Sequence, residues 1–220
     1  MDVYFISGLG ADSRIFKYID LPEGFRVRYV EWIDPLEKET LADYAGRLSE
    51  QVDMSEPFVL AGLSLGGIMA VEMAKKIPPV ATILISSIPL SRQLPPYFSF
   101  ARFIGITSVL PASFFKRAAL VKRALSAEDD EDKRLLRQLI REGNDRFIKW
   151  AVNAVLRWKN GNLPRLLWQI HGSRDEVFPV WLTRPTHLLR GAGHMAILTH
   201  KEEVNNALRE ILEKSTIKSL

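Results

Sequence analysis

The first candidate for a catalytic residue is a serine in a turn that glycines flank. Gly62 and Gly66 stand two positions before and after Ser64, between a short apolar run and a helix-like pattern. A serine at so sharp a strand-to-helix turn has a strained backbone, and its hydroxyl is held clear above the strand ends. Side chains in place of the two glycines would collide with the neighbouring strand or helix. The pattern predicts a nucleophilic serine, but on these residues alone a buried strand that enters a helix through a flexible glycine loop explains it equally well.

An acid and a base for this serine follow far downstream. A Ser hydroxyl is a poor nucleophile near neutral pH and needs an adjacent base, usually a His that a buried carboxylate holds in the right tautomer. Asp175 comes after the penultimate predicted strand and His194 after the last one. We therefore predict a catalytic triad of Ser64, Asp175 and His194, in the chain order that this strand topology requires. Glu176 is expected to point to solvent.

The other three histidines have simpler explanations. His171 lies inside a strand end, where a structural hydrogen bond is favoured over catalysis, while His187 begins a strand and His200 sits at a helix start. No His-Glu-x-x-His motif is present and no carboxylate stands at ligand spacing, so no metal site is predicted. The absence of cysteine excludes disulfides and thiolate metal sites.

The oxyanion of a tetrahedral intermediate needs hydrogen-bond donors aimed at it. Two backbone N–H groups are placed for that role: that of Leu65, directly after the serine at a helix N-terminus, and that of Leu9, in the turn after the first strand. Gly8 and Gly10 let this turn approach closely, although the turn alone would also need them. We predict Leu9 and Leu65 as the two donors.

Short apolar runs and helix-like patterns alternate along the chain, and these elements must position the residues named above. The predicted strands are 3–6, 25–30, 58–61, 81–85, 166–172 and 187–189. Helix-like patterns follow over residues 41–52, after Ser64, and in a closing helix with Val204 and Leu208 inside. This alternation predicts an α/β fold with a doubly wound, parallel sheet that is covered on both faces. In such sheets the chemistry gathers beyond the carboxyl ends of the strands, where Gly8 and Ser64 fall.

Between residues 89 and 164 the alternation breaks. The segment opens with prolines and aromatic residues and continues with a charged helical stretch over 129–141 and an aromatic helical stripe over 147–158. We expect a helical lid insertion at residues 89–164 within a single domain of residues 1–220. Most of its aromatic side chains are expected to pack it onto the sheet, and a minority to face a substrate pocket.

Composition and charge fit a soluble globular protein of 220 residues with a net charge of +4. Residues 88–165 carry 15 Lys and Arg against 7 Asp and Glu, a charge of +8, whereas the remainder carries −4. A basic middle segment attracts anionic substrates or surfaces, although solvated helix faces explain it more simply. With no Arg/Gly-rich tract and no nucleic-acid module, nucleic-acid binding is not expected.

Neither an integral membrane segment nor a targeting signal is expected. Arg102, several Ser and Thr residues and Pro111 argue against a membrane span over residues 97–115. The N-terminus lacks a basic region, and the run before Gly8 is too short for a signal peptide. We expect a cytoplasmic protein that starts directly with a strand.

Together these residues resemble the α/β-hydrolase family. The matching motifs are Gly62-Leu63-Ser64-Leu65-Gly66, Gly8-Leu9-Gly10, His171-Gly172-Ser173-Arg174-Asp175 and Gly191-Ala192-Gly193-His194. The resemblance covers the chain except the insertion, and it implies the roles given above to the triad and to the two backbone donors. It also implies a minimal sheet of six strands in the order 2-1-3-4-5-6, because the chain begins at what is usually the third strand. Many members carry His-Gly where this chain has Ser7-Gly8.

These observations predict a cofactor-free serine hydrolase that acts on a small-molecule substrate, the ester of a small or medium acyl group, through an acyl-enzyme. A Ser nucleophile argues against the epoxide hydrolases and dehalogenases of the family, which use Asp there. One alternative keeps the site but changes the reaction to thioester hydrolysis, C–C bond hydrolysis or a lyase reaction. The basic insertion favours an anionic substrate for it, such as an acyl-thioester of a phosphorylated carrier. The other alternative is a binding protein that keeps the triad but hardly turns over any substrate.

Overall fold

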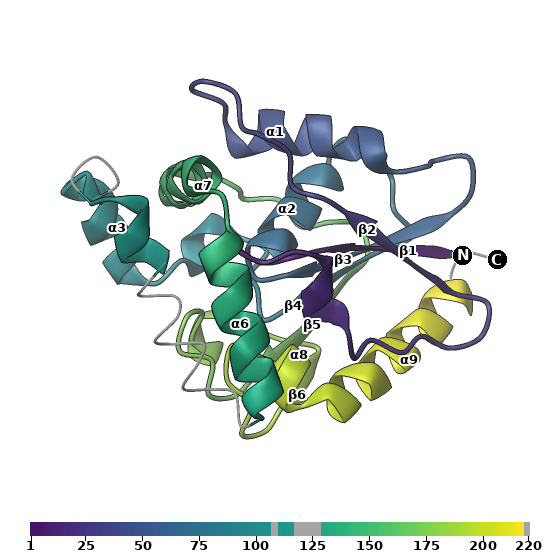
Figure 1. The fold of residues 1–220 in the computed structure, drawn as a ribbon. Coiled ribbons are helices and arrows are strands. Elements are labelled where there is room, and N and C mark those ends of the chain that lie inside the picture. The colour runs from purple at the N-terminus through teal and green to yellow at the C-terminus, as the bar shows by residue number, and fades with distance from the viewer. Residues whose placement is uncertain (107–109, 117–128, 218–220) are drawn as a thin grey trace.

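The chain is organised around a parallel sheet (Figure 1). The computed structural model describes residues 1–106, 110–116 and 129–217. Within this part of the chain the strands are β1 (Asp2–Ile6), β2 (Arg26–Val30), β3 (Phe58–Leu63), β4 (Ala81–Ile85), β5 (Leu167–Gly172) and β6 (His187–Leu189). They lie in the order β2-β1-β3-β4-β5-β6, and every neighbouring pair is parallel. The predicted six-stranded sheet and its strand order are thereby confirmed.

Side chains alternate between the two faces of the strands, and helices cover both faces. On β1, Val3 and Phe5 belong to one buried cluster, whereas Tyr4 and Ile6 belong to another. The helical elements that supply the first cluster are η1 (Ser13–Phe16), α6 (Asp130–Glu142), α8 (Ala196–Thr199) and α9 (Lys201–Ile217). Those that supply the second are α1 (Leu41–Leu48), α2 (Leu65–Met73) and α7 (Asp145–Arg157). Strands buried on both faces are continuous apolar runs in the sequence, as β3 and β4 are.

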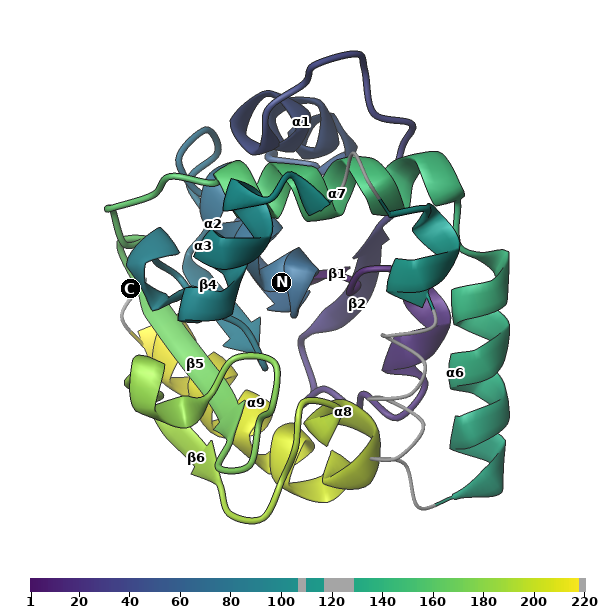
Figure 2. The same ribbon diagram turned by 90° about the vertical axis from the view of Figure 1, so that its left-hand side faces the viewer.

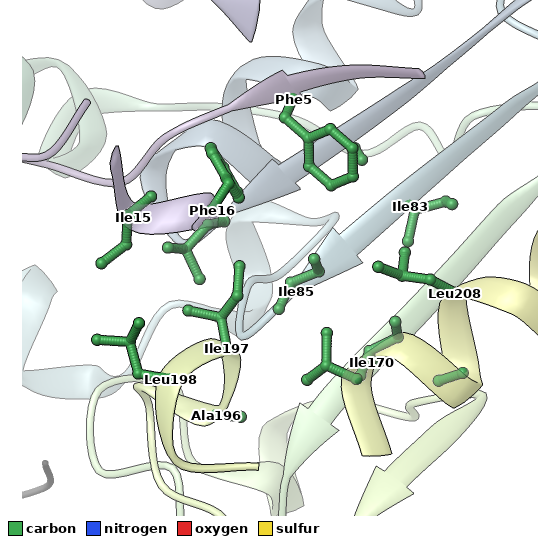
Figure 3. Packing of buried hydrophobic residues seen from close by; sticks show 14 of the residues in the cluster. Phe5, Ile15, Phe16, Ile83, Ile85, Ile170, Ala196, Ile197, Leu198 and Leu208 are labelled. Atoms are coloured by element: carbon green, nitrogen blue, oxygen red, sulfur yellow. The ribbon is translucent and has the colours of Figure 1, made fainter. Parts of the chain in front are cut away.

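Figure 3 shows the first cluster, where side chains of the sheet meet those of the C-terminal helices. Phe5, Ile83 and Ile170 of three different strands are completely buried, and so is Leu208 of α9. Full burial of one such side chain contributes about 1.5–3 kcal/mol to the hydrophobic driving force. These contacts hold the sheet together, and the candidate site lies at the carboxyl ends of its strands.

Between β4 and β5 the chain leaves the sheet for the insertion, which lies beyond the carboxyl ends of the strands (Figures 1 and 2). Its described elements include η3 (Ser91–Gln93), α3 (Pro96–Phe103), α6 and α7. The last two correspond to the stretches predicted over 129–141 and 147–158, whereas residues 107–109 and 117–128 of the predicted insertion lie outside the described residues. Within the described chain, none of the helices combines the length and the apolar character that crossing a bilayer requires.

A polar residue at the corner between α6 and α7 caps the start of α7, directly after Gly143, which ends α6. The side chain of Asn144 accepts hydrogen bonds from the backbone N–H groups of Arg146, over 2.9 Å, and Phe147, over 3.1 Å. These two groups have no partner inside the helix, so this N-cap stabilises the start of α7. This cap fixes the residue at which α7 begins above the strand ends.

The aromatic side chains of the insertion differ between its helices. Phe147 on α7 and Trp158 just after it are buried in the second cluster, as expected. On α3, however, Phe100 is 66% exposed and Phe103 is 86% exposed. The expectation that most such side chains pack onto the sheet therefore fails for α3. This helix packs mainly against α7, so these rings have no sheet beneath them.

Candidate active site

Ser64 lies in the sharp turn between β3 and α2. Its φ of 53° and ψ of −116° belong to a region that residues other than glycine rarely adopt. Its backbone N–H donates to the carbonyl of Ile85 over 2.9 Å, and its own carbonyl accepts from the hydroxyl of Ser87 over 2.6 Å and from the N–H of Gly67 over 3.0 Å. The strained turn is therefore present, and the end of β4 holds it in place.

Two glycines make room for this turn. A Cβ atom on Gly62 would collide with the backbone of Gly66, and one on Gly66 would collide with the carbonyl oxygens of Ile6 and Ser7. Backbone atoms cannot move aside without a shift of β1 or α2. Both glycines are thus required by close approach, for the reason that the sequence indicates.

His194 links Ser64 to Asp175. It lies in the loop after β6, and Asp175 lies in the turn after β5. The Nε2 atom of His194 is 2.9 Å from Ser64 Oγ, while Nδ1 is 3.0 Å from Oδ1 and 2.9 Å from Oδ2 of Asp175. All three residues are buried, with exposed fractions of 7% for Ser64, 2% for His194 and 4% for Asp175. The structure brings together three residues that come from three separate strand ends.

The carboxylate of Asp175 determines which ring nitrogen of His194 carries the proton. A carboxylate only accepts, so Nδ1 donates to it and Nε2 remains an acceptor for the Ser64 hydroxyl. Burial acts to raise the pKa of Asp175, but the charge and the hydrogen bond of His194, helped by His171 and the backbone N–H of Phe178, hold it below its usual value. Asp175 is therefore ionised at neutral pH and keeps the imidazole in one orientation.

The turn that carries Asp175 is held by its own backbone and by His171. Oδ1 of Asp175 accepts from the N–H groups of Val177, over 2.9 Å, and Phe178, over 2.8 Å. His171 donates from Nε2 to the carbonyl of Phe178 over 2.7 Å, and the same nitrogen lies 3.5 Å from Asp175 Oδ2. The structural hydrogen bond expected for His171 is present, and it lies directly against the acid.

Two supporting contacts escape the sequence analysis. Glu176 is exposed, as expected, but its Oε2 also accepts from the backbone N–H of His194 over 3.3 Å and so ties the turn after β5 to the loop after β6. Ser87 supports the carbonyl of Ser64. The sequence offers little signal for either, beyond the position of Glu176 beside Asp175 and of Ser87 at a strand end.

The other histidines lie outside this cluster. The Nε2 atom of His187 is 3.5 Å from Oε2 of Glu210, and Nδ1 of His200 is 2.9 Å from the hydroxyl of Thr199. Within the residues that the structure covers, no group of three or more His, Asp or Glu side chains is arranged to hold a metal ion.

Comparison with known proteins identifies the family. A family model described as "Alpha/beta hydrolase family" matches residues 3–207. The chain belongs to the alpha/beta hydrolase family. A search of the curated proteins found no match.

Several solved structures resemble this α/β-hydrolase over nearly its whole length. A thermophilic esterase from Thermogutta terrifontis superimposes with a TM-score of 0.75 at 19% identity, covering 98% of this chain and 90% of the other. MenH from S. aureus gives a TM-score of 0.73 at 16% identity, covering 98% and 94%. ClbQ from the colibactin NRPS/PKS pathway gives a TM-score of 0.63 at 18% identity, covering 98% of both chains. At these identities the likeness shows a shared fold.

In this α/β-hydrolase the turn after β1 carries Leu9 and lies against the start of α2, whose first residue is Leu65. The N–H of Ala11 donates to the carbonyl of Gly8 over 3.1 Å, and the hydroxyl of Ser7 donates to the carbonyl of Ala11 over 2.8 Å. Ser7 occupies the position where many family members carry His, and here its hydroxyl braces the turn. The two predicted donors thus lie on two adjoining segments next to the nucleophile turn.

Proposed function

We propose that this protein is a cofactor-free serine hydrolase that cleaves the ester of a small or medium acyl group through an acyl-enzyme. The observation that carries the proposal is the unbroken chain of hydrogen bonds from Ser64 Oγ through His194 to Asp175. The fold alone would not select this reaction, because one fold supports many activities and the chemistry resides in the site.

The geometry supports a two-step reaction. Ser64 Oγ attacks the acyl carbon while His194 Nε2 takes its proton, and Asp175 stabilises the imidazolium that forms. The carbonyl electron pair moves onto oxygen, where the backbone N–H groups of Leu9 and Leu65 donate to the oxyanion. His194 then protonates the leaving alcohol as its bond to carbon breaks, which leaves the acyl group on Ser64. A water that His194 deprotonates then attacks this ester. As the bond between Ser64 Oγ and the acyl carbon breaks, His194 returns the proton to Ser64 and the carboxylic acid is released.

We also propose that the insertion of residues 89–164 acts as a lid over this site. Helices α3, α6 and α7 lie beyond the carboxyl ends of the strands, the edge at which the three side chains meet (Figure 2). An insertion in this place excludes water from the reacting groups and limits which acyl groups reach Ser64.

Labelling with a fluorophosphonate probe, followed by site mapping with mass spectrometry, tests the nucleophile. The expected label is on Ser64, it is abolished in Ser64→Ala, and it forms much more slowly in His194→Ala. Ser99→Ala, which removes an exposed hydroxyl on α3, serves as the control and labels like the wild type. Labelling that persists in Ser64→Ala would refute the assignment.

Turnover of p-nitrophenyl esters from acetate to decanoate tests the reaction itself. Asp175→Asn can keep both backbone hydrogen bonds at Oδ1 but presents an amide NH₂ to Nδ1 of His194, which moves the ring proton to Nε2. Because Nε2 then cannot accept the Ser64 proton, kcat is expected to fall by about 10³–10⁴-fold with an unchanged circular dichroism spectrum. A loss of less than tenfold would contradict the role of Asp175.

A second candidate, thioester hydrolysis at the same site, is supported by the distribution of positive charge. A hollow of about 430 Å³ between α3 and α7 is lined by Arg102, Arg157 and Lys159 and by no carboxylate. Such a hollow suits the phosphate of a carrier-bound acyl thioester. An oxygen ester and a thioester of the same acyl group decide between the candidates: a kcat/KM more than tenfold higher for the thioester would select the second.

A further inference from the structure

A separate hollow of about 530 Å³ lies beside β5, between η3 and η4 (Val180–Leu182). We propose that this hollow, called the η4 hollow below, binds a carboxylate that carries an apolar chain, at a site distinct from that of Ser64. Its volume falls within the range of about 300–1,000 Å³ that small-molecule sites occupy.

Two arginines supply recognition of the negative charge. Arg92 and Arg184 both line the η4 hollow, and no carboxylate does. Both side chains are exposed, and neither has an ion pair or a hydrogen bond with another described residue. Their guanidinium groups give the hollow a positive charge that attracts an anion. A carboxylate matches the planar set of N–H donors that each guanidinium group presents.

The same wall contains a buried hydroxyl that could serve as a further hydrogen-bond donor. Thr183 lines the η4 hollow and is only 7% exposed, and its Oγ1 has no hydrogen-bond partner among the described residues. Buried polar groups in folded proteins are nearly always paired, and leaving one unpaired is unfavourable. Because Oγ1 itself is closed off from solvent, a carboxylate oxygen would become its partner only after the Thr183 side chain turns toward the hollow.

The remaining wall selects an anion with an apolar body. The apolar residues of this wall are Pro89, Leu90, Leu163, Leu167, Trp181 and Leu182. Trp181 is 73% exposed and Leu163 is 58% exposed, so both offer surface that an alkyl chain would remove from water. An inorganic anion would use the arginines but would leave this surface exposed.

Gln169 and Ser87 lie between the η4 hollow and the nucleophile turn. Gln169 lines the hollow and donates from Nε2 to the carbonyl of Ser87 over 2.6 Å, and the hydroxyl of Ser87 donates to the carbonyl of Ser64. Neither Asp175 nor His194 lines the hollow. A ligand there would contact none of Ser64, Asp175 and His194, and its binding requires no turnover.

Titration with sodium octanoate tests the site, with octanamide as a probe of the same chain length that lacks the charge. Calorimetry and tryptophan emission are expected to show saturable binding of octanoate, and octanamide is expected to bind about tenfold more weakly or worse. Arg92→Gln and Arg184→Gln should each weaken octanoate binding by a similar factor. Trp181→Phe should abolish most of the emission change, because the indole of Trp181 forms part of the apolar wall.

Arg137→Gln serves as the matched control, because Arg137 is an exposed arginine of α6 that does not line the η4 hollow. It should bind octanoate like the wild type. Absence of saturable octanoate binding, or equal affinity for octanamide, would overturn the proposal. So would octanoate binding that is unchanged in both arginine variants, since that result would place the ligand elsewhere, for example at Ser64. None of these measurements depends on hydrolysis, so they stand or fall separately from the proposed function.

Discussion

Asp175 and His171 are buried side by side, but Asp175 is charged and His171 is neutral. Oδ2 of Asp175 and Nε2 of His171 lie 3.5 Å apart, and both residues are buried. For Asp175, the effect of burial is outweighed by His194 and by backbone N–H groups, and the lowered pKa keeps it charged. For His171, burial is the larger effect and lowers the pKa, although Asp175 and the carbonyl of Phe178 oppose it. The result is a charged acid beside a neutral imidazole, whose N–H holds the carbonyl of Phe178.

The lowered pKa of His171 makes stability depend on pH. Below its ordinary value of 6.5 the unfolded chain binds a proton that the folded protein does not, so the free energy of unfolding falls as pH drops from there toward the folded pKa. His171→Gln, which can still donate to Phe178, should flatten this decline. Urea unfolding at intervals between pH 5 and 8 measures it. Above pH 7 the two proteins should differ by a constant offset, and parallel curves down to pH 5 would contradict the prediction.

The clustering of Ser64, Asp175 and His194 is predictable from the sequence, but the contacts that support it are not. Ser64, Asp175 and His194 can be selected because residue type, strand-end position and chain order together exclude the other candidates. The hydrogen bonds of Ser87 and Glu176 join side chains to backbone groups far away in the sequence. Nothing in the local pattern distinguishes such residues from ordinary polar loop residues.

At the scale of elements, the site depends on how closely α2 approaches β1. A Cβ atom on Gly66 would collide with backbone carbonyl oxygens at the end of β1, and these cannot rotate away as a side chain can. The helix that begins at Leu65 therefore lies at a separation from the end of β1 that no side chain at position 66 would permit. An oxyanion site built from both elements needs that separation, because donors must lie about 2.7–3.1 Å from the oxyanion.

Gly66→Ala should therefore force α2 away from β1, with a loss of about 1–3 kcal/mol of stability and a much larger loss of the proposed esterase activity. Gly46→Ala is the matched control, because Gly46 lies inside α1 and its Cβ would meet only the flexible side chain of Lys76, at 3.3 Å. That variant should gain about 0.5–1 kcal/mol, as alanine usually does in a helix. Urea unfolding and p-nitrophenyl ester turnover measure both variants. Equal effects of the two substitutions would show that the close approach at Gly66 carries no special constraint.

The elements themselves were predictable to different degrees. Strands β3 and β4 are buried throughout and almost entirely apolar, and α7 has an aromatic stripe at helical spacing, so pattern alone suffices. The exposure of Phe100 and Phe103 on α3 was not predictable, because an apolar helical pattern does not reveal whether a partner surface lies beneath it. The η4 hollow also depends on what is packed beside β5, which no local pattern encodes.

At the scale of the whole molecule, the insertion is fastened to both helical layers across the strand ends (Figure 2). On one side α6 contacts the residue after η1: Nζ of Lys17 lies 2.9 Å from Oδ1 of Asp132 on α6. On the other side α7 reaches the segment before α1, where Trp150 donates from Nε1 to the carbonyl of Glu39 over 2.9 Å. Two attachments on opposite faces hold these helices over the site as a wall.

The net charge of the insertion does not show which of its cations are paired with carboxylates. Some of its cations are neutralised, as Lys116 is by Asp145, whereas no carboxylate lines the hollow that contains Arg102 and Lys159. The sequence shows the excess of positive charge, but it does not show which cations are neutralised and which are not. Pairing depends on distances between segments that are far apart in the chain.

The contact between Lys17 and Asp132 offers a test of how strongly the insertion is attached. Asp132 has a side chain that is only 7% exposed, and Lys17 also contacts Glu131 over 2.8 Å. Burial acts to lower the pKa of Lys17, but its hydrogen bonds with Glu131, Asp132 and Tyr18 hold it above the usual value. The ammonium group therefore stays charged and neutralises a carboxylate that water hardly reaches.

Lys17→Met should leave the carboxylate of Asp132 buried without its cation. Removal of one partner of a fully buried pair costs about 3–5 kcal/mol, and since the Lys17 side chain is 24% exposed we expect about 1–3 kcal/mol. Adding Asp132→Asn should recover part of this loss, because an amide needs no counter-ion. Lys214→Met is the control, since the pair of Lys214 and Glu210 on α9 is half exposed, and it should change stability by about 0.5 kcal/mol or less. If urea unfolding shows equal losses for Lys17→Met and Lys214→Met, the attachment of α6 does not depend on this ion pair, and the packing of Leu136 and Leu139 must carry it instead.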